Sequence, residues 1–317
     1  MKKKRSVNEN YPGINIASCG LGVNSIAGII EATNRGVIFD HILFANTGIY
    51  YSKGEKQATY AYLEVFNQWL LKNGQPYITL LHSKNVNGEI ISLYDEVYKL
   101  DTLPSIVFGW KSCSQRFKGA VQDKHVSTLP EVQEDRLNGN TLRKWIFYDA
   151  DESHRAKEYS DDKFEVYYFL VDIDFGRFEC LKVIADQGLP IPQKSSCKYC
   201  PSTKPYQIIE LYETERLGFY ESAELERNAL RGGKLLNVLG LGRDWSWWEL
   251  ILAYRYFRFF KKNASSISKV HPKIKKMIKR INRSKPEKLS PRNQNPSDLI
   301  CNLFTSANDI PCGCYDG

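Results

Sequence analysis

Short apolar runs of strand length alternate with helical patterns along the first half of the chain. This alternation is typical of repeating β–α units, which build a parallel sheet with right-handed crossovers. A helix is predicted to begin near Asn24 and Ser25, because both residue types are favoured at helix starts. The predicted strands cover residues 14–17, 39–47, 77–83, 142–150 and 165–173, and further helices cover residues 56–74 and 177–188. Residues 84–112 are less regular, which predicts an excursion from the sheet.

The pattern changes beyond Pro190, where closely spaced cysteines are followed by helical patterns over residues 205–230 and 246–262 and then by a basic segment. We therefore predict two regions, an α/β domain over residues 1–190 and a helical, basic region with cysteine motifs over residues 191–317. The predicted fold class is α/β. It consists of a doubly wound, mainly parallel, Rossmann-like sheet with a helical, cysteine-bearing C-terminal extension.

A glycine-rich loop joins the first strand to the first helix in "IASCGLGVNSIAGII", residues 16–30. Gly20 and Gly22 are expected to supply the backbone freedom of a tight turn, and the N–H groups at a helix start attract anions. Three interpretations are open: a dinucleotide site of the G-x-G-x-x-G type, the pyrophosphate loop of ATP pyrophosphatases (S-G-G-x-D-S), or a turn that binds nothing. The dinucleotide site is less favoured because Asp40 begins the second strand, whereas that fold needs an acid at its end.

Composition places the chain among ordinary globular proteins, with 317 residues, 42% of them hydrophobic and 25% charged. The longest apolar stretch, "WSWWELILAYRYFRFF", contains Glu249, Arg255 and Arg258, so no run suits a membrane span. The basic N-terminus lacks the apolar segment of a secretory signal. We therefore expect a cytoplasmic protein with no membrane association.

Positive charge is concentrated in one segment of a chain whose net charge is +8. Between Arg255 and Arg292 the only acid is Glu287, and every other charged residue there is a lysine or an arginine. Such a segment predicts contact with a polyanion, most commonly nucleic acid. The alternative is a solvated basic arm that keeps the protein in solution.

Two of the cysteine spacings suit metal binding. Cys197-x-x-Cys200 and Cys312-x-Cys314 form two thiolate pairs, and four thiolates satisfy either tetrahedral Zn²⁺ or a 4Fe-4S cluster. The alternative for the first pair is two reduced structural cysteines. Cys180 lies in an apolar helical pattern and is expected to be a core thiol, and Cys19 is expected to act in packing beside the loop.

Four motifs in one order, spanning residues 14–205, resemble the phosphoadenosine phosphosulfate (PAPS) reductase family of the adenine nucleotide alpha hydrolase (HUP, PP-loop) superfamily. The second strand ends in "FANTG", similar to the family's F-A-D-T-G, and follows the glycine-rich loop. "GWKSCSQRFKGAVQDKHV" is similar to its C-T-x-x-x-K stretch, and "YDADESHRAKEY" to its G-x-x-x-D-E-S-x-R segment. "GLPIPQKSSCKYCPSTKP" resembles its G-L-P-x-P-x-K-S-x-C-x-x-C-P block.

The resemblance implies an enzyme that binds ATP or a related adenine nucleotide with Mg²⁺. The substrate would be adenylated with release of pyrophosphate. A sulfur or amine nucleophile would then displace AMP, and a sulfur-donor protein is the expected partner for sulfur transfer. The phosphate-binding positions would be Ser18, Gly20, Gly22, Val23, Asn24 and Ser25, and Ala45, Asn46 and Thr47 would edge the adenine. The catalytic positions would be Lys118, Asp151, Glu152 and Arg155. Asn24 departs from the motif's aspartate and so lacks the charge that would help to order magnesium.

The cysteines resemble those of PP-loop sulfurtransferases of DNA phosphorothioation, which implies a 4Fe-4S cluster held by Cys113, Cys197 and Cys200. The fourth ligand would be Cys301, Cys312 or Cys314. One alternative is a thiol-dependent PAPS reductase, since "PCGCYDG" is similar to the family's C-terminal segment and would place Cys312 as the nucleophile. Another is a non-catalytic protein that senses a nucleotide or binds nucleic acid.

Overall fold

The structure is a computed structural model, and it describes residues 11, 13–104, 112–157, 164–235, 238–260 and 272–284. The predicted ligands Cys301, Cys312 and Cys314 therefore lie outside the described residues. The same holds for much of the basic segment 255–292, of which residues 255–260 and 272–284 are described.

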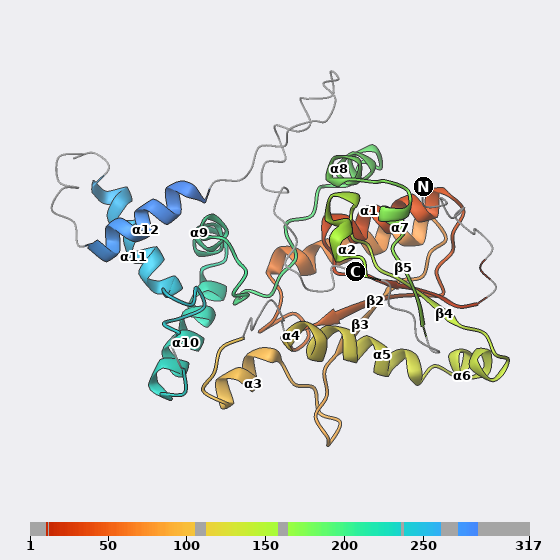
Figure 1. The fold of residues 1–317 in the computed structure, drawn as a ribbon, viewed down its shortest axis with the longest axis horizontal. Helices are drawn as coiled ribbons and strands as arrows, with labels where there is room; N and C mark the ends of the chain where they lie inside the picture. Colours follow the sequence, from red (N-terminus) through yellow and green to blue (C-terminus); the bar gives the residue numbers. More distant parts are fainter. Residues whose placement is uncertain are drawn as a thin grey trace.

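Five parallel strands form the central sheet, in the order β3-β2-β1-β4-β5 (Figure 1). The strands are β1 (Asn15–Ser18), β2 (His41–Asn46), β3 (Ile78–His82), β4 (Leu142–Trp145) and β5 (Phe164–Tyr167). The order runs outward in one direction from β1 to β3 and in the other from β4 to β5. The predicted α/β class and parallel sheet are confirmed, in an arrangement consistent with a Rossmann-like fold.

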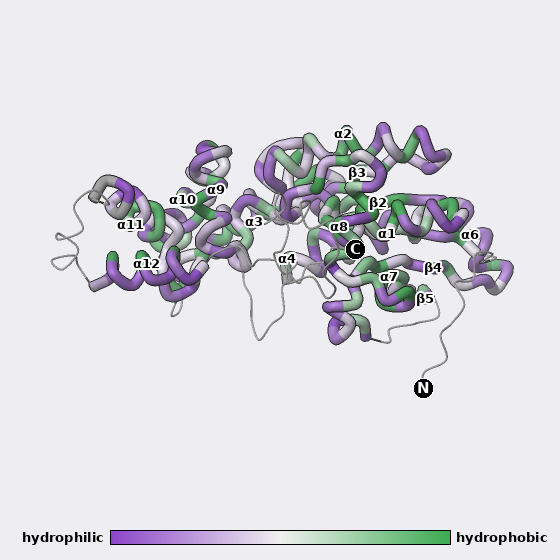
Figure 2. The backbone as a smooth tube through the Cα atoms, turned by 90° about the horizontal axis from the view of Figure 1, so that it is seen from above, coloured by the Kyte–Doolittle hydropathy of each residue, from purple (hydrophilic) through white to green (hydrophobic). Residues whose placement is uncertain are grey.

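Helices cover both faces of this sheet. Successive strand residues point to opposite faces, so Ile16 and Leu43 pack beneath the sheet with Val126 and Val132, whereas Ala17 packs above it. Above the sheet lie α1 (Val23–Asn34), α2 (Gln57–Lys72) and α8 (Arg177–Asp186). Below it lie α5 (Ala120–Ser127) and α6 (Pro130–Leu137). In Figure 2, α2 carries both green and purple bands, as expected for a helix with one buried face.

A second group of helices lies beside the sheet in both views (Figures 1 and 2). It comprises α9 (Pro205–Thr214), α10 (Arg216–Arg231), α11 (Trp247–Phe260) and α12 (Pro272–Arg283). Its apolar cluster includes Phe219, Trp247 and Met277, and it also takes in Leu93 of α3 (Leu93–Lys99) and Phe117. The domain boundary at residue 190 stays a prediction, since this cluster draws on residues from both sides of it.

The last two predicted strands are too long. β4 ends at Trp145, and the six-residue 3-10 helix η2 (Ala150–Arg155) follows where strand was expected to continue. β5 ends at Tyr167, and residues Phe169–Asp172 form the short helix α7. β5 pairs only with β4, so the ladder has no further partner once β4 ends.

One helical prediction also needs correction, whereas the predicted excursion over residues 84–112 contributes no strand to the sheet in its described part. The helix expected over residues 205–230 is broken at Glu215, whose carboxylate accepts a bond from Gln57 N at 2.9 Å and pairs with Lys198 Nζ at 3.2 Å. Tertiary contacts therefore place a bend inside one continuous helical pattern. The irregular stretch 84–112 contains α3, which the Ser92 hydroxyl caps by accepting from Asp95 N at 2.9 Å. Among the described helices, none is both long and apolar enough to cross a bilayer.

Candidate functional site

The glycine-rich loop lies where the strand order reverses. β1 ends at Ser18, α1 begins at Val23, and β1 pairs with β2 on one side and β4 on the other. In open α/β sheets, ligands bind outside the carboxyl ends of the strands at such a reversal. The sheet therefore brings the predicted loop, residues 18–25, next to the segment that follows β4.

The backbone of the loop differs from the sequence expectation. The residue with positive φ is Leu21 (φ 58°), whereas Gly20 and Gly22 keep negative φ. Gly22 matters for another reason, because a Cβ placed on it would lie 3.0 Å from Ser195 Oγ and would need that side chain to shift. The glycine thus permits the close approach of residue 195, which comes from the cysteine-containing block far along the chain.

α1 begins at Val23, next to the predicted helix start at Asn24 and Ser25. Gly22 is the N-cap residue and provides no side-chain cap, and Asn24 is 2% exposed. Its Oδ1 accepts a 2.7 Å hydrogen bond from Arg177 Nη1, across 153 residues of sequence. A guanidinium group is therefore held beside the positive end of α1, next to the helix N–H groups that have no partner within the helix.

The segment after β4 meets the loop through the same arginine. Arg177 N, at the start of α8, donates to Asp151 Oδ2 at 2.9 Å. Asp149 caps η2 by accepting from Glu152 N at 3.0 Å. Burial raises the pKa of Asp149, and the nearby positive charge of Arg177 opposes that rise. The structure thus brings two predicted site residues to Arg177, Asp151 to its backbone N–H and Asn24 to its guanidinium group.

Glu152 and Arg155 form a pair within η2. Arg155 Nη1 lies 2.7 Å from Glu152 Oε2, and the guanidinium lies over the Tyr148 ring at 4.1 Å from its centroid. Burial raises the pKa of Glu152, and Arg155 lowers it in turn.

Lys118 lies in a different cluster from Asp151 and Arg155. Its Nζ is 3.4 Å from Glu55 Oε1, and the Glu55 side chain is fully buried. The Thr47 hydroxyl donates to the same oxygen at 3.2 Å. The positive charge of Lys118 is therefore engaged by a buried carboxylate.

The predicted adenine-edging residues Ala45, Asn46 and Thr47 are buried at the end of β2. Asn46 Oδ1 accepts from the Tyr60 hydroxyl at 2.8 Å and from Gly48 N at 2.9 Å. The side chain of Asn46 therefore bonds to the protein backbone and to the Tyr60 hydroxyl, and that of Thr47 bonds to the buried Glu55 carboxylate. The backbone of this strand end remains the part that could border a ligand.

Cys113, Cys197 and Cys200 belong to the apolar cluster of the second helical group, where Cys113 is partly buried. Cys200 N donates to Cys197 O at 3.1 Å, and Cys197 forms a backbone bridge with Glu55. Within the described ranges, no three or more His, Cys, Asp or Glu residues are grouped so as to hold a metal. Cys113, Cys197 and Cys200 are thus not grouped in this way within those ranges, and the metal centre stays a prediction.

The other two described thiols behave as expected. Burial raises the pKa of Cys19 to about 11, so this thiol stays protonated near neutral pH. Cys180 is fully buried in the core cluster of the sheet, which confirms its assignment as a core thiol, and burial raises its pKa as well.

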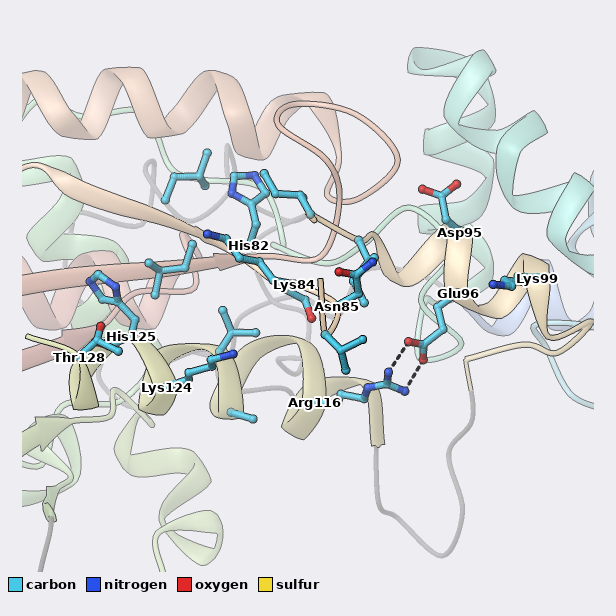
Figure 3. Close-up of a pocket in the computed structure, with 18 of the residues that line it drawn as sticks. His82, Lys84, Asn85, Asp95, Glu96, Lys99, Arg116, Lys124, His125 and Thr128 are labelled. Atoms are coloured by element: carbon cyan, nitrogen blue, oxygen red, sulfur yellow. Dashed lines mark hydrogen bonds and ion pairs between the residues drawn. The ribbon is translucent and has the colours of Figure 1, made fainter. Parts of the chain in front are cut away.

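A groove lies away from the loop, with a volume of about 1070 Å³, between the end of β3, the segment after it, α3 and α5 (Figure 3). Its two carboxylates are engaged, Asp95 with Lys53 at 2.8 Å and Glu96 with Arg116 at 2.6 Å. Lys84, Lys99 and Lys124 come from three different elements and have no ion-pair partner among the described residues. Burial lowers the pKa of His82 and of His125. The groove therefore presents a net positive, partly apolar surface.

Several of these residues were missed by sequence reasoning. Arg177 and Glu55 are single charged residues outside any recognised pattern. Gln122, whose Oε1 accepts from the Ser18 hydroxyl at 2.8 Å, lies inside the quoted C-T-x-x-x-K-like stretch but was not singled out. Ser195 was inside the quoted cysteine block, but nothing in its sequence context indicates that it faces Gly22. Only the fold reveals these contacts. Comparison with models of known protein families gives no match, and comparison with curated proteins gives none either.

Proposed function

We propose that the chain is a PP-loop enzyme of the HUP type that binds ATP or a related adenine nucleotide at the loop of residues 18–25. The observation that carries the proposal is Arg177, which joins Asn24 at the start of α1 to Asp151 in η2. Helix N–H groups and a guanidinium group at one point suit a phosphate. Their position at the reversal of strand order supports the same assignment.

In the proposed reaction, a substrate oxygen attacks the α-phosphorus of ATP. The bond from that phosphorus to the bridging oxygen breaks, and pyrophosphate leaves with the electron pair. A sulfur nucleophile from a donor protein then displaces AMP from the adenylated substrate. Arg177 and Arg155 offset the developing charge on phosphate oxygens, and Glu152 accepts a proton from the attacking group. Mg²⁺, when bound, screens phosphate charge, and Asp149 and Asp151 are the carboxylates nearest the loop that could hold it.

Isothermal titration of the protein with ATP tests this proposal, with adenosine as the comparison. Because the proposed site contacts the phosphates of the nucleotide, we expect ATP to bind at least 10-fold more tightly than adenosine. Equal affinity for the two compounds, or no heat of binding with ATP, would contradict the proposed site.

We also propose that Cys197 and Cys200 contribute to a 4Fe-4S or Zn²⁺ centre whose other ligands come from Cys113 and from Cys301, Cys312 or Cys314. The support is the C-x-x-C spacing and the shared cluster of the three described cysteines. A serine hydroxyl is a much poorer metal ligand than a cysteine thiolate, so Cys197→Ser and Cys200→Ser are each expected to lose the bound metal. Metal analysis after anaerobic purification measures this, and Cys180→Ala is the matched control. Full metal content in both serine variants would contradict the centre.

A nucleic acid is the proposed polyanionic partner. α12 places its apolar side chains, including Met277, against the second helical group, while Lys273, Lys275 and Lys279 are exposed. Lys276 and Arg280 are paired with Asp244, at 3.3 and 2.6 Å. Lys273 also pairs with Glu249 at 4.0 Å. The amphipathic pattern therefore places basic side chains on the exposed part of α12, which supports contact with phosphates.

We expect binding to single-stranded nucleic acid to weaken steeply as salt rises, because each phosphate contact releases counterions. Fluorescence anisotropy with a labelled oligonucleotide across a salt series measures the slope. Replacing Lys273, Lys275 and Lys279 together by glutamine should reduce that slope by about 2 units. A matched triple variant at Lys84, Lys99 and Lys124 shows whether the groove takes part. Affinity that is independent of salt would indicate a solubilising surface only.

A further inference from the structure

Ser195 lies directly over the start of α1. Its Oγ would be 3.0 Å from a Cβ placed on Gly22, the N-cap residue of that helix. The segment that carries it is buried, with Ser195 3% exposed and Cys197 8% exposed. An anion held by the N–H groups at the start of α1 therefore has Ser195 as an immediate neighbour.

The Ser195 hydroxyl has no hydrogen-bond partner within the described part of the chain. The two hydroxyls of the loop itself differ, since Ser18 Oγ donates to Gln122 Oε1 at 2.8 Å and Ser25 Oγ donates to Gly22 O at 3.1 Å. A hydroxyl that no described residue engages can donate to a ligand. Its position over a helix start places that donor where an anion would bind.

We propose that the Ser195 hydroxyl donates a hydrogen bond to the phosphate group of the nucleotide bound at residues 18–25. This inference rests on the proposed nucleotide site and adds a binding residue from the opposite side. The phosphate is then held by backbone N–H groups of α1 below and by the Ser195 O–H above. A hydroxyl is well suited to this role, because it adds a donor without adding charge beside Arg177.

The same contact links the nucleotide to the cysteine pair. Ser195 is two residues from Cys197, whose backbone bridges to Glu55, and Lys198 N donates to Gly54 O at 3.0 Å. The segment is thus fixed at Glu55 and Gly54 on one side, and a bound phosphate fixes it at Ser195. Nucleotide binding therefore adds a second point at which the segment that contains Cys197 is held.

Ser195→Ala tests the inference, with Ser196→Ala as a matched control at an adjacent residue that is 2% exposed. Loss of a hydrogen bond to a charged group is expected to weaken ATP binding about 10-fold or more in Ser195→Ala. Adenosine affinity should not change. Because the hydroxyl has no protein partner, the unfolding temperature without nucleotide should equal or exceed that of the parent. Ser196→Ala should match the parent in all three measurements.

Three outcomes would overturn the inference. Equal ATP affinity in the parent and Ser195→Ala would remove Ser195 from the site and leave the proposed nucleotide binding intact. A lower unfolding temperature together with equal weakening for ATP and adenosine would show a structural role. A parent protein that binds neither ATP nor inorganic pyrophosphate would overturn the proposed function, and the inference with it.

Discussion

Gly22→Val is expected to abolish ATP binding, with affinity at least 100-fold weaker than in the parent. A valine Cβ would lie 3.0 Å from Ser195 Oγ, and its methyl groups would occupy space at the helix start where the phosphate has to fit. The backbone of Gly22, at φ −93° and ψ 171°, lies in a region that valine adopts readily. The loss of binding should therefore arise from occupied space rather than from a distorted backbone.

Calorimetric titration with ATP measures this effect, and circular dichroism checks the fold. Replacing an N-cap glycine by a β-branched residue is expected to cost about 1 kcal/mol of stability, too little to unfold the domain. Gly22→Ala is the graded control and should retain weakened binding. Equal ATP affinity in Gly22→Val and the parent would show that the loop does not hold the phosphates.

The largest effect on stability is expected from Glu226→Ala. Glu226 is 2% exposed, and its Oε1 accepts from Leu241 N and from Trp247 N, both at 2.8 Å. Its Oε2 accepts from Trp248 N at 3.4 Å. The Glu226 carboxylate thus accepts hydrogen bonds from backbone N–H groups at the start of α11 and in the loop before it. Alanine would leave these buried N–H groups without an acceptor, and we expect a loss of about 3 kcal/mol or more in urea unfolding.

Glu226→Gln separates the hydrogen bonds from the charge, because the amide oxygen can still accept from both backbone groups. Burial raises the pKa of Glu226 from 4.5 to about 7. The folded state therefore binds the Glu226 proton more tightly than the unfolded state does. The stability that this protonation contributes is fully present below about pH 4.5 and is lost as pH rises through about 7. The parent should lose about 3 kcal/mol more than Glu226→Gln between these limits. Identical pH profiles for the two proteins would contradict the assignment.

The parallel sheet could be predicted because each of its strands and helices has a recognisable pattern within a short stretch of sequence. Residues 39–47 and 77–83 contain apolar runs of strand length between helical patterns, and β2 and β3 lie inside them. The loop at residues 18–25 was likewise visible as a break between two regular patterns. The sequence did not indicate where β4 and β5 end, since that depends on how far each strand finds a partner in the sheet.

The contacts of the candidate site could not be predicted in the same way. Arg177 and Asn24 are 153 residues apart, and Lys118 and Glu55 meet only because the π-helical turn η1 (Gln115–Gly119) packs against the end of β2. Lys118 was expected to face the reacting phosphate with Arg155, whereas the fold gives it a buried carboxylate. Such pairings depend on the tertiary arrangement of separate elements, which no local pattern encodes.

Hydrogen–deuterium exchange with and without ATP tests the central claim most directly, because it shows where the nucleotide binds. We predict slower exchange in peptides that cover residues 18–25 and 149–155, and in the segment that contains Ser195. Peptides from the groove, such as residues 84–100, should be unchanged. Slower exchange confined to the groove, or no change at residues 18–25, would contradict a nucleotide site at the start of α1.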